Sequence, residues 1–208
     1  MGKHTQSIDS KVLSRIQSHG RGWVFTPTHF DDLAGSSTLT TILKRHTDAE
    51  KIRNLARGLY DYPKTDPQLG LLQPTVDDIA NALAGRDEIR IQPSGAYAAN
   101  LLGLSTQVPM KVVYLTDGRS RTVHVGKRQI LLRNTTPKNM AAAGKISGLI
   151  IQALKHLGKD QVDDHVIDQL DRRLDDAARK QLMKDIRSAP AWIADIFRKL
   201  AQPKKDHK

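Results

Sequence analysis

Apolar residues recur at helical spacing through the first third of the chain, and this spacing predicts three helices. The first covers residues 8–18 and ends at the glycines that follow. The second covers residues 27–33, where Thr26 is placed to cap it. The third begins at Ser36 or Ser37, after a glycine turn. The positions expected to face inward on this third helix are Leu39, Ile42 and Leu43.

A β-hairpin is predicted directly after the third helix. Residues 52–55 and 59–62 alternate as two short strands do, and Gly58 supplies the positive φ that a tight turn between them favours. A short extended segment, residues 23–25, lies between the first two helices. Helix, strand, helix, turn, helix and hairpin in this order form a winged helix-turn-helix, whose third helix enters the DNA major groove and whose hairpin is the wing.

The third helix and the wing carry the residues expected to contact DNA. Polar side chains occupy the outer face of the helix, and an arginine at the wing tip can offer a fixed fork of donors to a phosphate. The candidate DNA-binding residues are Ser37, Thr38, Thr40, Thr41, Lys44, Arg45, Arg53 and Arg57. Because Asp48 and Glu50 follow the helix closely, we expect modest affinity from one protomer and two copies on a repeated operator of double-stranded DNA.

The rest of the chain mixes strands and helices. The segment TDPQLGLLQP is the best candidate linker, so we predict one domain over residues 1–66 and a second over residues 67–208. In the second domain a helix opens at Pro74-Thr75, and strands fall mainly within residues 89–133, where KVVYLT is the strongest. Helical spacing resumes over residues 137–201. The predicted fold class is α+β, with a small antiparallel sheet and a helical C-terminal half.

The net charge makes a polyanionic partner plausible. The 208 residues include 33 Lys and Arg against 22 Asp and Glu, which gives +11 at pH 7. Residues 1–66, 67–136 and 137–208 carry +3, +3 and +5, so by this division the excess is spread along the chain. The sequence has no cysteine, no signal peptide and no apolar run long enough to span a bilayer, so we expect a cytoplasmic protein without membrane contact.

No catalytic chemistry is predicted. Phosphate-binding glycine loops and the G-x-S-x-G frame are both absent, and Ser94 is more simply explained as a helix cap than as a nucleophile. The acids and the histidine at residues 163–168 share a helix face, but charged faces produce such spacings by chance. We therefore expect neither an enzyme nor a metal or cofactor.

Several stretches resemble one family of bacterial regulators. The segments GRGWVFTPTHFDDL, SSTLTTILKR and IRNLARGLYDYP, followed by SGAYAANLLGLS and VVYLTDG, resemble the AbiEi-type antitoxins of type IV toxin–antitoxin systems over most of the chain. The wing motif R-G-L-Y-x-x-P corresponds to Arg57, Gly58, Leu59, Tyr60 and Pro63. The resemblance implies a DNA-binding repressor of its own operon that also counteracts a nucleotidyltransferase-type toxin, with or without direct contact.

The resemblance also implies that antitoxin activity belongs to the C-terminal part. Candidates for a functional surface there are Lys138, Lys145, Arg172, Arg173 and Arg179, although ordinary solvated cations explain the same residues. Two alternatives to an antitoxin repressor stay open. The chain can be a stand-alone winged-helix transcriptional regulator, or a winged helix that docks proteins and does not bind DNA.

Overall fold

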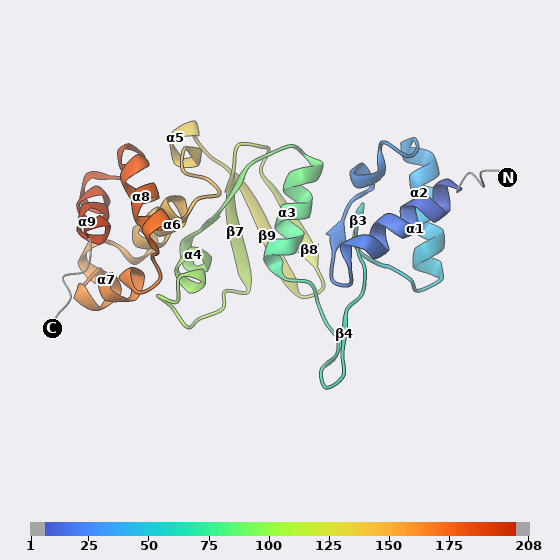
Figure 1. Ribbon diagram of the computed structural model, residues 1–208, viewed down its shortest axis with the longest axis horizontal. Coiled ribbons are helices and arrows are strands. Elements are labelled where there is room, and N and C mark those ends of the chain that lie inside the picture. Colours follow the sequence, from blue (N-terminus) through green and yellow to red (C-terminus); the bar gives the residue numbers. More distant parts are fainter. Residues whose placement is uncertain (1–6, 203–208) are drawn as a thin grey trace. The chain divides into compact units, whose positions relative to one another are not determined.

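The computed structural model describes residues 7–202 and confirms the α+β class (Figure 1). Contacts divide the chain into two compact units. The first comprises residues up to Glu88 together with His124–Lys127, and the second comprises Ile89–Val123 and the residues from Arg128 onward. This grouping describes contacts within the folded chain and not independent folding, so the predicted domain boundary at residue 66 stays a prediction.

The first unit contains most of the elements predicted for a winged helix. In chain order they are α1 (Ile8–His19), β1 (Val24–Phe25), the 3₁₀ helix η1 (Pro27–Phe30), α2 (Ser36–Asp48), β2 (Arg53–Ala56), β3 (Leu59–Asp61), β4 (Thr65–Asp66), β5 (Gly70–Leu71) and α3 (Val76–Arg86).

The second unit contains a four-stranded sheet and the remaining helices. Its elements are β6 (Ile91–Ser94), α4 (Gly95–Leu101), β7 (Lys111–Thr116), β8 (Arg121–Val125), β9 (Arg128–Asn134), α5 (Pro137–Met140), α6 (Ile146–Leu157), η2 (Lys159–Gln161), α7 (Asp164–Asp171), α8 (Asp176–Lys184), η3 (Ile186–Ser188) and α9 (Ala191–Ala201). The last two residues of β8 count with the first unit.

The helix-strand-helix layout of the first unit is compatible with a winged helix, with two local differences from the prediction. The second helix is only the 3₁₀ helix η1, because Thr26 and His29 close a capping box around a single turn. The third helix, α2, already includes Ser36, and its N-cap is Gly35. The predicted inward residues of α2 are buried, in one apolar cluster with α1 and with residues of β1 and η1.

The wing belongs to a three-stranded sheet in the order β1-β3-β2. β3 pairs antiparallel with both neighbours, and the β2–β3 register places Arg53 opposite Asp61. Gly58 has a φ of 68°, which a residue with a Cβ adopts only at a cost. Leu59 and Tyr60 are buried, and Tyr60 joins the apolar cluster that contains the inner face of α2.

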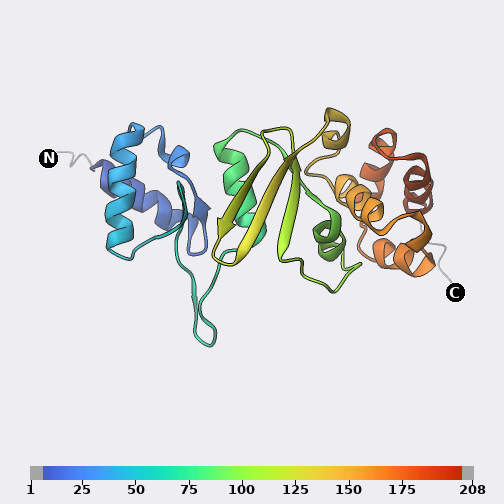
Figure 2. The same cartoon turned by 180° about the vertical axis from the view of Figure 1, so that it is seen from behind.

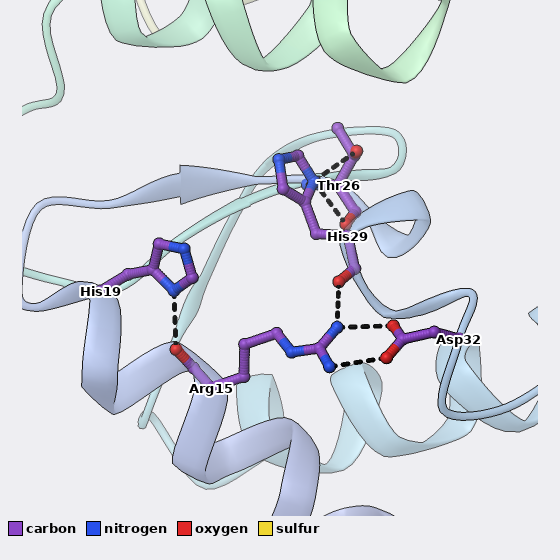
Figure 3. A network of polar contacts seen from close by, with 5 residues as sticks. All are labelled: Arg15, His19, Thr26, His29 and Asp32. Carbon is purple, nitrogen blue, oxygen red and sulfur yellow. Dashed lines mark hydrogen bonds and ion pairs between the residues drawn. The ribbon is translucent and has the colours of Figure 1, made fainter.

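An arginine fixes the position of α1 against the segment that leads into α2 (Figure 3). Two Nη atoms of Arg15 donate to the two carboxylate oxygens of Asp32 at 2.6 and 2.7 Å, and Nη1 also donates to the carbonyl of His29 at 2.7 Å. The bond to Asp32 raises the pKa of Arg15. Nδ1 of His29 accepts the backbone N–H of Thr26 at 3.2 Å and lies 3.1 Å from its hydroxyl oxygen.

The predicted linker contains a second small hairpin. β4 and β5 pair antiparallel, and Asp66 accepts the backbone N–H groups of Gln68 and Leu69 in the turn. Leu69 is 78% exposed. α3 follows, and Thr75 and Asp78 form its capping box, so the helix predicted to open at Pro74-Thr75 is confirmed.

The sheet of the second unit has the order β6-β7-β9-β8. β6 pairs antiparallel with β7, but β7 and β9 are parallel, with Lys111 opposite Gln129 and Leu115 opposite Arg133. The sequence pattern did not predict this parallel pair, because it joins two strands that are separated along the chain by a third. The loop after β7 leads to β8 at the edge of the sheet, and β9 lies between β7 and β8. The side chain of Asn134, at the end of β9, donates to the carbonyl of Gly118 in that loop at 2.8 Å.

The C-terminal helices surround a second apolar core, which also includes residues of α4. Ser94 occupies the N-cap position of α4, as predicted, although its hydroxyl donates to Gln152 at 3.4 Å and not to the helix. Gly148 of α6 lies directly against the carbonyl of Ala142, where an added Cβ would overlap backbone. Within residues 7–202, no helix combines the length and the apolar character needed to cross a membrane.

Candidate nucleic-acid interface

The outer face of α2 is polar and exposed, as a helix that enters a DNA groove requires. The predicted contact residues on this helix that are exposed are Ser37, Thr38, Thr40, Thr41, Lys44 and Arg45. Thr40 and Thr41 donate their hydroxyl protons to the carbonyls four residues earlier, at 2.8 and 3.1 Å. These two hydroxyls therefore keep acceptor capacity toward a ligand, whereas their protons are used within the helix.

The two cations of α2 have acidic partners. Nζ of Lys44 lies 2.8 Å from Asp48, and the bond to Asp48 raises the pKa of Lys44. Arg45 pairs with Asp9 of α1. Burial favours the protonated form of Asp9, but Arg45 and the neighbouring His46 outweigh it and leave the pKa of Asp9 lowered. A phosphate would have to compete with these carboxylates for Lys44 and Arg45.

Arg53 is held by the fold more strongly than the cations of α2. Its Nε donates to Asp61 at 2.9 Å, its Nη2 contacts the other oxygen of Asp61, and Nη2 also donates to the carbonyl of Leu72 at 2.9 Å. The Asp61 side chain is only 1% exposed. The bond to Asp61 raises the pKa of Arg53. The geometry thus gives Arg53 a structural task, and its role as a phosphate contact stays a prediction.

Arg57 differs from the other predicted cations. It is exposed at the tip of the wing, between β2 and β3, and within the described part of the chain it forms no ion pair or side-chain hydrogen bond. A guanidinium without a carboxylate partner keeps its full hydrogen-bonding fork for a phosphate. Arg57 is therefore the predicted contact whose surroundings fit the role best.

A groove of about 930 Å³ lies beside the wing in the first unit, and the sequence pattern did not predict it. Its walls come from the ends of α1 and α2, from β2 and from the chain around β5. Arg21 lies in it with its guanidinium carbon 4.9 Å from the centre of the Tyr62 ring, and donates to the carbonyl of Pro63 at 3.0 Å. Lys51 is a further exposed cation of the lining. These residues meet only through tertiary structure, so no spacing in the sequence could have brought them together.

The predicted antitoxin surface is divided between different environments. Lys145 pairs with Asp185 at 2.9 Å, and Arg179 pairs with Asp171 at 2.6 Å and contacts the carbonyl of Leu200. Lys138, Arg172 and Arg173 are exposed, and the guanidinium of Arg173 lies against Gly103. Figures 1 and 2 place α5, which carries Lys138, and α7, which precedes Arg172, at opposite edges of the helical part of the unit.

The charge distribution corrects one expectation from the sequence. Residues 1–88 contain 11 Lys and Arg and 11 Asp and Glu, so they carry no net charge. Residues 89–159 contain 11 Lys and Arg and a single acid, Asp117, and therefore carry +10. The excess is concentrated and not spread. The earlier division at residues 66 and 136 concealed this, because the parts 67–136 and 137–208 each joined a portion of residues 89–159 to acidic neighbours.

The comparisons with known proteins give a family and no function. No curated protein matches the chain. Residues 11–182 match DUF6088, which is described as a family of unknown function, and this match runs from the first turn of α1 through most of α8. The protein therefore belongs to the DUF6088 family.

Proposed function

We propose that this protein is an antitoxin and a DNA-binding autorepressor of a type IV toxin–antitoxin operon, acting in the cytoplasm. The observation that carries the DNA-binding part is Arg57, an exposed arginine with no ion-pair partner among residues 7–202. It lies at the tip of a hairpin that follows a helix with a polar, exposed outer face. A winged helix uses these two elements to bind DNA. The resemblance to AbiEi-type antitoxins supports the rest of the proposal.

The proposed mode of binding assigns a different task to each element. α2 enters the major groove, where Thr38, Thr40 and Thr41 lie at base edges or phosphates, and the wing places Arg57 on the backbone. Residues 1–66 carry only +3, and residues 67–88 cancel this charge, so electrostatic attraction from this part of the chain is weak. Two copies on a repeated operator then supply the affinity that one copy lacks.

The antitoxin part belongs to the C-terminal helices. The exposed cations Lys138, Arg172 and Arg173 form its candidate surface, whereas Lys145 and Arg179 support the fold through their ion pairs. The proposed target is a nucleotidyltransferase-type toxin encoded beside this gene. Neutralisation through a complex and neutralisation without contact are both compatible with this surface.

A fluorescence anisotropy titration with the DNA upstream of the gene tests the DNA-binding part. We expect Arg57→Ala to weaken binding to all sequences and to reduce the slope of log K against log salt by about one unit, since one phosphate contact is lost. Arg187→Ala is the matched control, because it removes one exposed arginine that lies outside the winged helix. It should leave both quantities unchanged.

The alternatives give different results. If the protein binds its upstream DNA no better than random DNA at moderate salt, the repressor proposal is wrong and a protein-docking winged helix is favoured. If DNA binds but co-expression with the adjacent gene restores no growth, the protein is a stand-alone regulator. If Arg57→Ala and Arg187→Ala behave alike, the wing is purely structural.

A further inference from the structure

The groove beside the wing has an apolar wall that can cover part of a ligand. Its volume of about 930 Å³ is in the range of sites for small molecules, and the residues that line it all belong to the first unit. The apolar residues of the lining are Leu13, Ile52, Tyr62, Pro63 and Leu71. Leu71 is 51% exposed, so an occupant that removes its side chain from water gains free energy. The groove therefore favours a ligand with an apolar body.

Arg21 enters the groove from the loop between α1 and β1, and backbone hydrogen bonds join this loop to the segment that carries Tyr62. The N–H group of Gly22 donates to the carbonyl of Tyr62 at 2.6 Å, and the N–H group of Tyr62 donates to the carbonyl of Trp23 at 2.9 Å. The backbone of Arg21 is thus held beside the apolar wall before a ligand binds. Such preorganisation lowers the entropic cost of binding.

The guanidinium of Arg21 is also held in place, but its charge is not neutralised. Its Nη1 donates to the carbonyl of Pro63, and its carbon lies over the Tyr62 ring. Arg21 is exposed, and within residues 7–202 it forms no ion pair. Its remaining N–H groups can donate to a planar anion such as a carboxylate. Because Tyr62 and Pro63 lie beside the guanidinium, an anion bound there places the body attached to it against the apolar wall.

The charges of the lining favour a ligand with a single negative charge. The cations that line the groove are Arg21, Lys51 and Arg53, and the buried Asp61 neutralises Arg53. Glu50 is the one acid among the described residues of the lining, and it offsets one of the two remaining cations. One positive charge is left. It complements a monoanion, whereas Glu50 disfavours a phosphate with two negative charges or a polyanion.

We infer that the groove is a binding site for a small organic acid with one carboxylate and an apolar body. Arg21 binds the carboxylate through its remaining N–H groups, and Tyr62, Pro63 and Leu71 cover the apolar body. Aromatic acids and medium-chain fatty acids share this chemistry. The inference uses neither Arg57 nor the outer face of α2. It therefore goes beyond the proposed function and stands or fails independently of DNA binding.

The test is a titration of the isotope-labelled full chain, without DNA, with naphthoate and separately with octanoate, followed through the amide chemical shifts in NMR spectra. We expect at least one acid to bind with a Kd of about 1 mM, which is the range for a ligand of this size. It should shift the amides of Thr47, Asn54 and Thr65, which line the groove. Naphthamide and octanamide lack the charge and should bind at least tenfold more weakly. Inorganic phosphate and AMP should also bind more weakly than the acids.

Three variants make the test specific. Arg21→Gln removes the group that binds the carboxylate and should raise the Kd about tenfold. Arg187→Gln is the matched control, because it removes an exposed arginine of the second unit, and it should leave the Kd unchanged. Leu71→Thr removes apolar area but keeps a residue that suits a strand, and it should raise the Kd about threefold. Equal thermal midpoints of the variants and the wild type would show that weaker binding does not come from unfolding.

The inference is overturned if neither acid binds at about 10 mM, if the amides bind as tightly as the acids, or if AMP binds more tightly. It is also overturned if Arg21→Gln and Arg187→Gln behave alike, or if the shifted amides lie in the second unit. Failure of the operator titration alone concerns the proposed function and leaves this inference standing.

Discussion

Arg53 and Asp61 form an ion pair in which a cation near the proposed DNA-binding helix stabilises the fold. Asp61 lies at 1% exposure on β3, and the guanidinium of Arg53 joins it to the carbonyl of Leu72 across the edge of the sheet. A buried carboxylate without its partner is far less favourable than the pair itself. Loss of DNA binding on removal of Arg53 would therefore be ambiguous unless stability is measured as well.

We expect Arg53→Ala to lower the free energy of unfolding by about 3 kcal/mol, because it leaves the buried Asp61 charge unpaired. Arg53→Met/Asp61→Leu should recover most of this loss, since no buried charge remains. Urea denaturation of the two variants measures the difference. Equal loss in the single and double variants would contradict a structural role for the pair.

At the scale of single residues, the sequence allowed us to predict which residues belong to the candidate site, but not the carboxylates with which its cations pair. The exposed face of α2 follows from helical periodicity, which is local. The pairing of Arg45 with Asp9 and of Arg53 with Asp61 depends on tertiary contacts, and no spacing encodes these. Among the predicted cations, Arg57 alone has no acidic partner within residues 7–202, because a wing tip has few neighbours.

Among the elements, the hairpin β2–β3 was predictable because its turn requires an unusual backbone. Gly58 has a positive φ, and an added Cβ would come no closer than 4.0 Å to Arg86, so the strain of a substitution would arise from the backbone and not from a clash. By contrast, η1 was predicted as a full helix, because Pro27 and Thr26 indicate where a helix starts and not how long it continues.

We expect Gly58→Ala to lower the free energy of unfolding by about 1 kcal/mol, the cost of the left-handed region for an L-residue. Gly58→Asn should cost less, since asparagine tolerates this region better. Chemical denaturation measures both. Gly85→Ala, in α3 with open space around it, is the matched control, because alanine favours the helix and should not lower the stability. A Gly58→Ala variant as stable as the control would contradict the turn geometry.

For the molecule as a whole, the partly buried His29 and the buried His46 make stability depend on pH. Burial lowers the pKa of His29, and the nearby Arg15 and His19 lower it further against the opposing bond to Thr26. Burial also lowers the pKa of His46, and Lys51 and Arg45 add to this against the opposing charge of Asp9. In the unfolded chain both rings titrate near their ordinary value of about 6.5.

Since the folded pKa values lie below the unfolded ones, the unfolded chain binds more protons as the pH falls. The stabilising effect is complete above about pH 6.5 and is lost as the pH falls through the folded values. We expect the thermal midpoint to fall between about pH 7.5 and pH 5.5. His29→Gln/His46→Gln should flatten this dependence, and His165→Gln, exposed on α7, should not. A wild-type midpoint that rises toward pH 5.5 would contradict the assignment.

The fold class and the main helices were predictable from the sequence, because periodicity and capping are local, whereas the β4–β5 hairpin in the predicted linker was not predicted. The strand order of the second unit was not, because the pairing of β7 with β9 joins residues separated by an intervening strand. The net positive charge of residues 89–159 can be counted from the sequence alone, but the unit boundary after residue 88 was needed to choose this segment.

The parallel pairing of β7 and β9 also has a consequence for biosynthesis. On the ribosome β7 emerges before its central partner, and one of its edges stays open until Asn134 has been made. β8, which emerges next, pairs at the far side of β9 and cannot close that edge. An unpaired edge strand is prone to pair with other chains. Like charges on Lys111 and on the basic residues that follow it disfavour such pairing between neighbouring nascent chains.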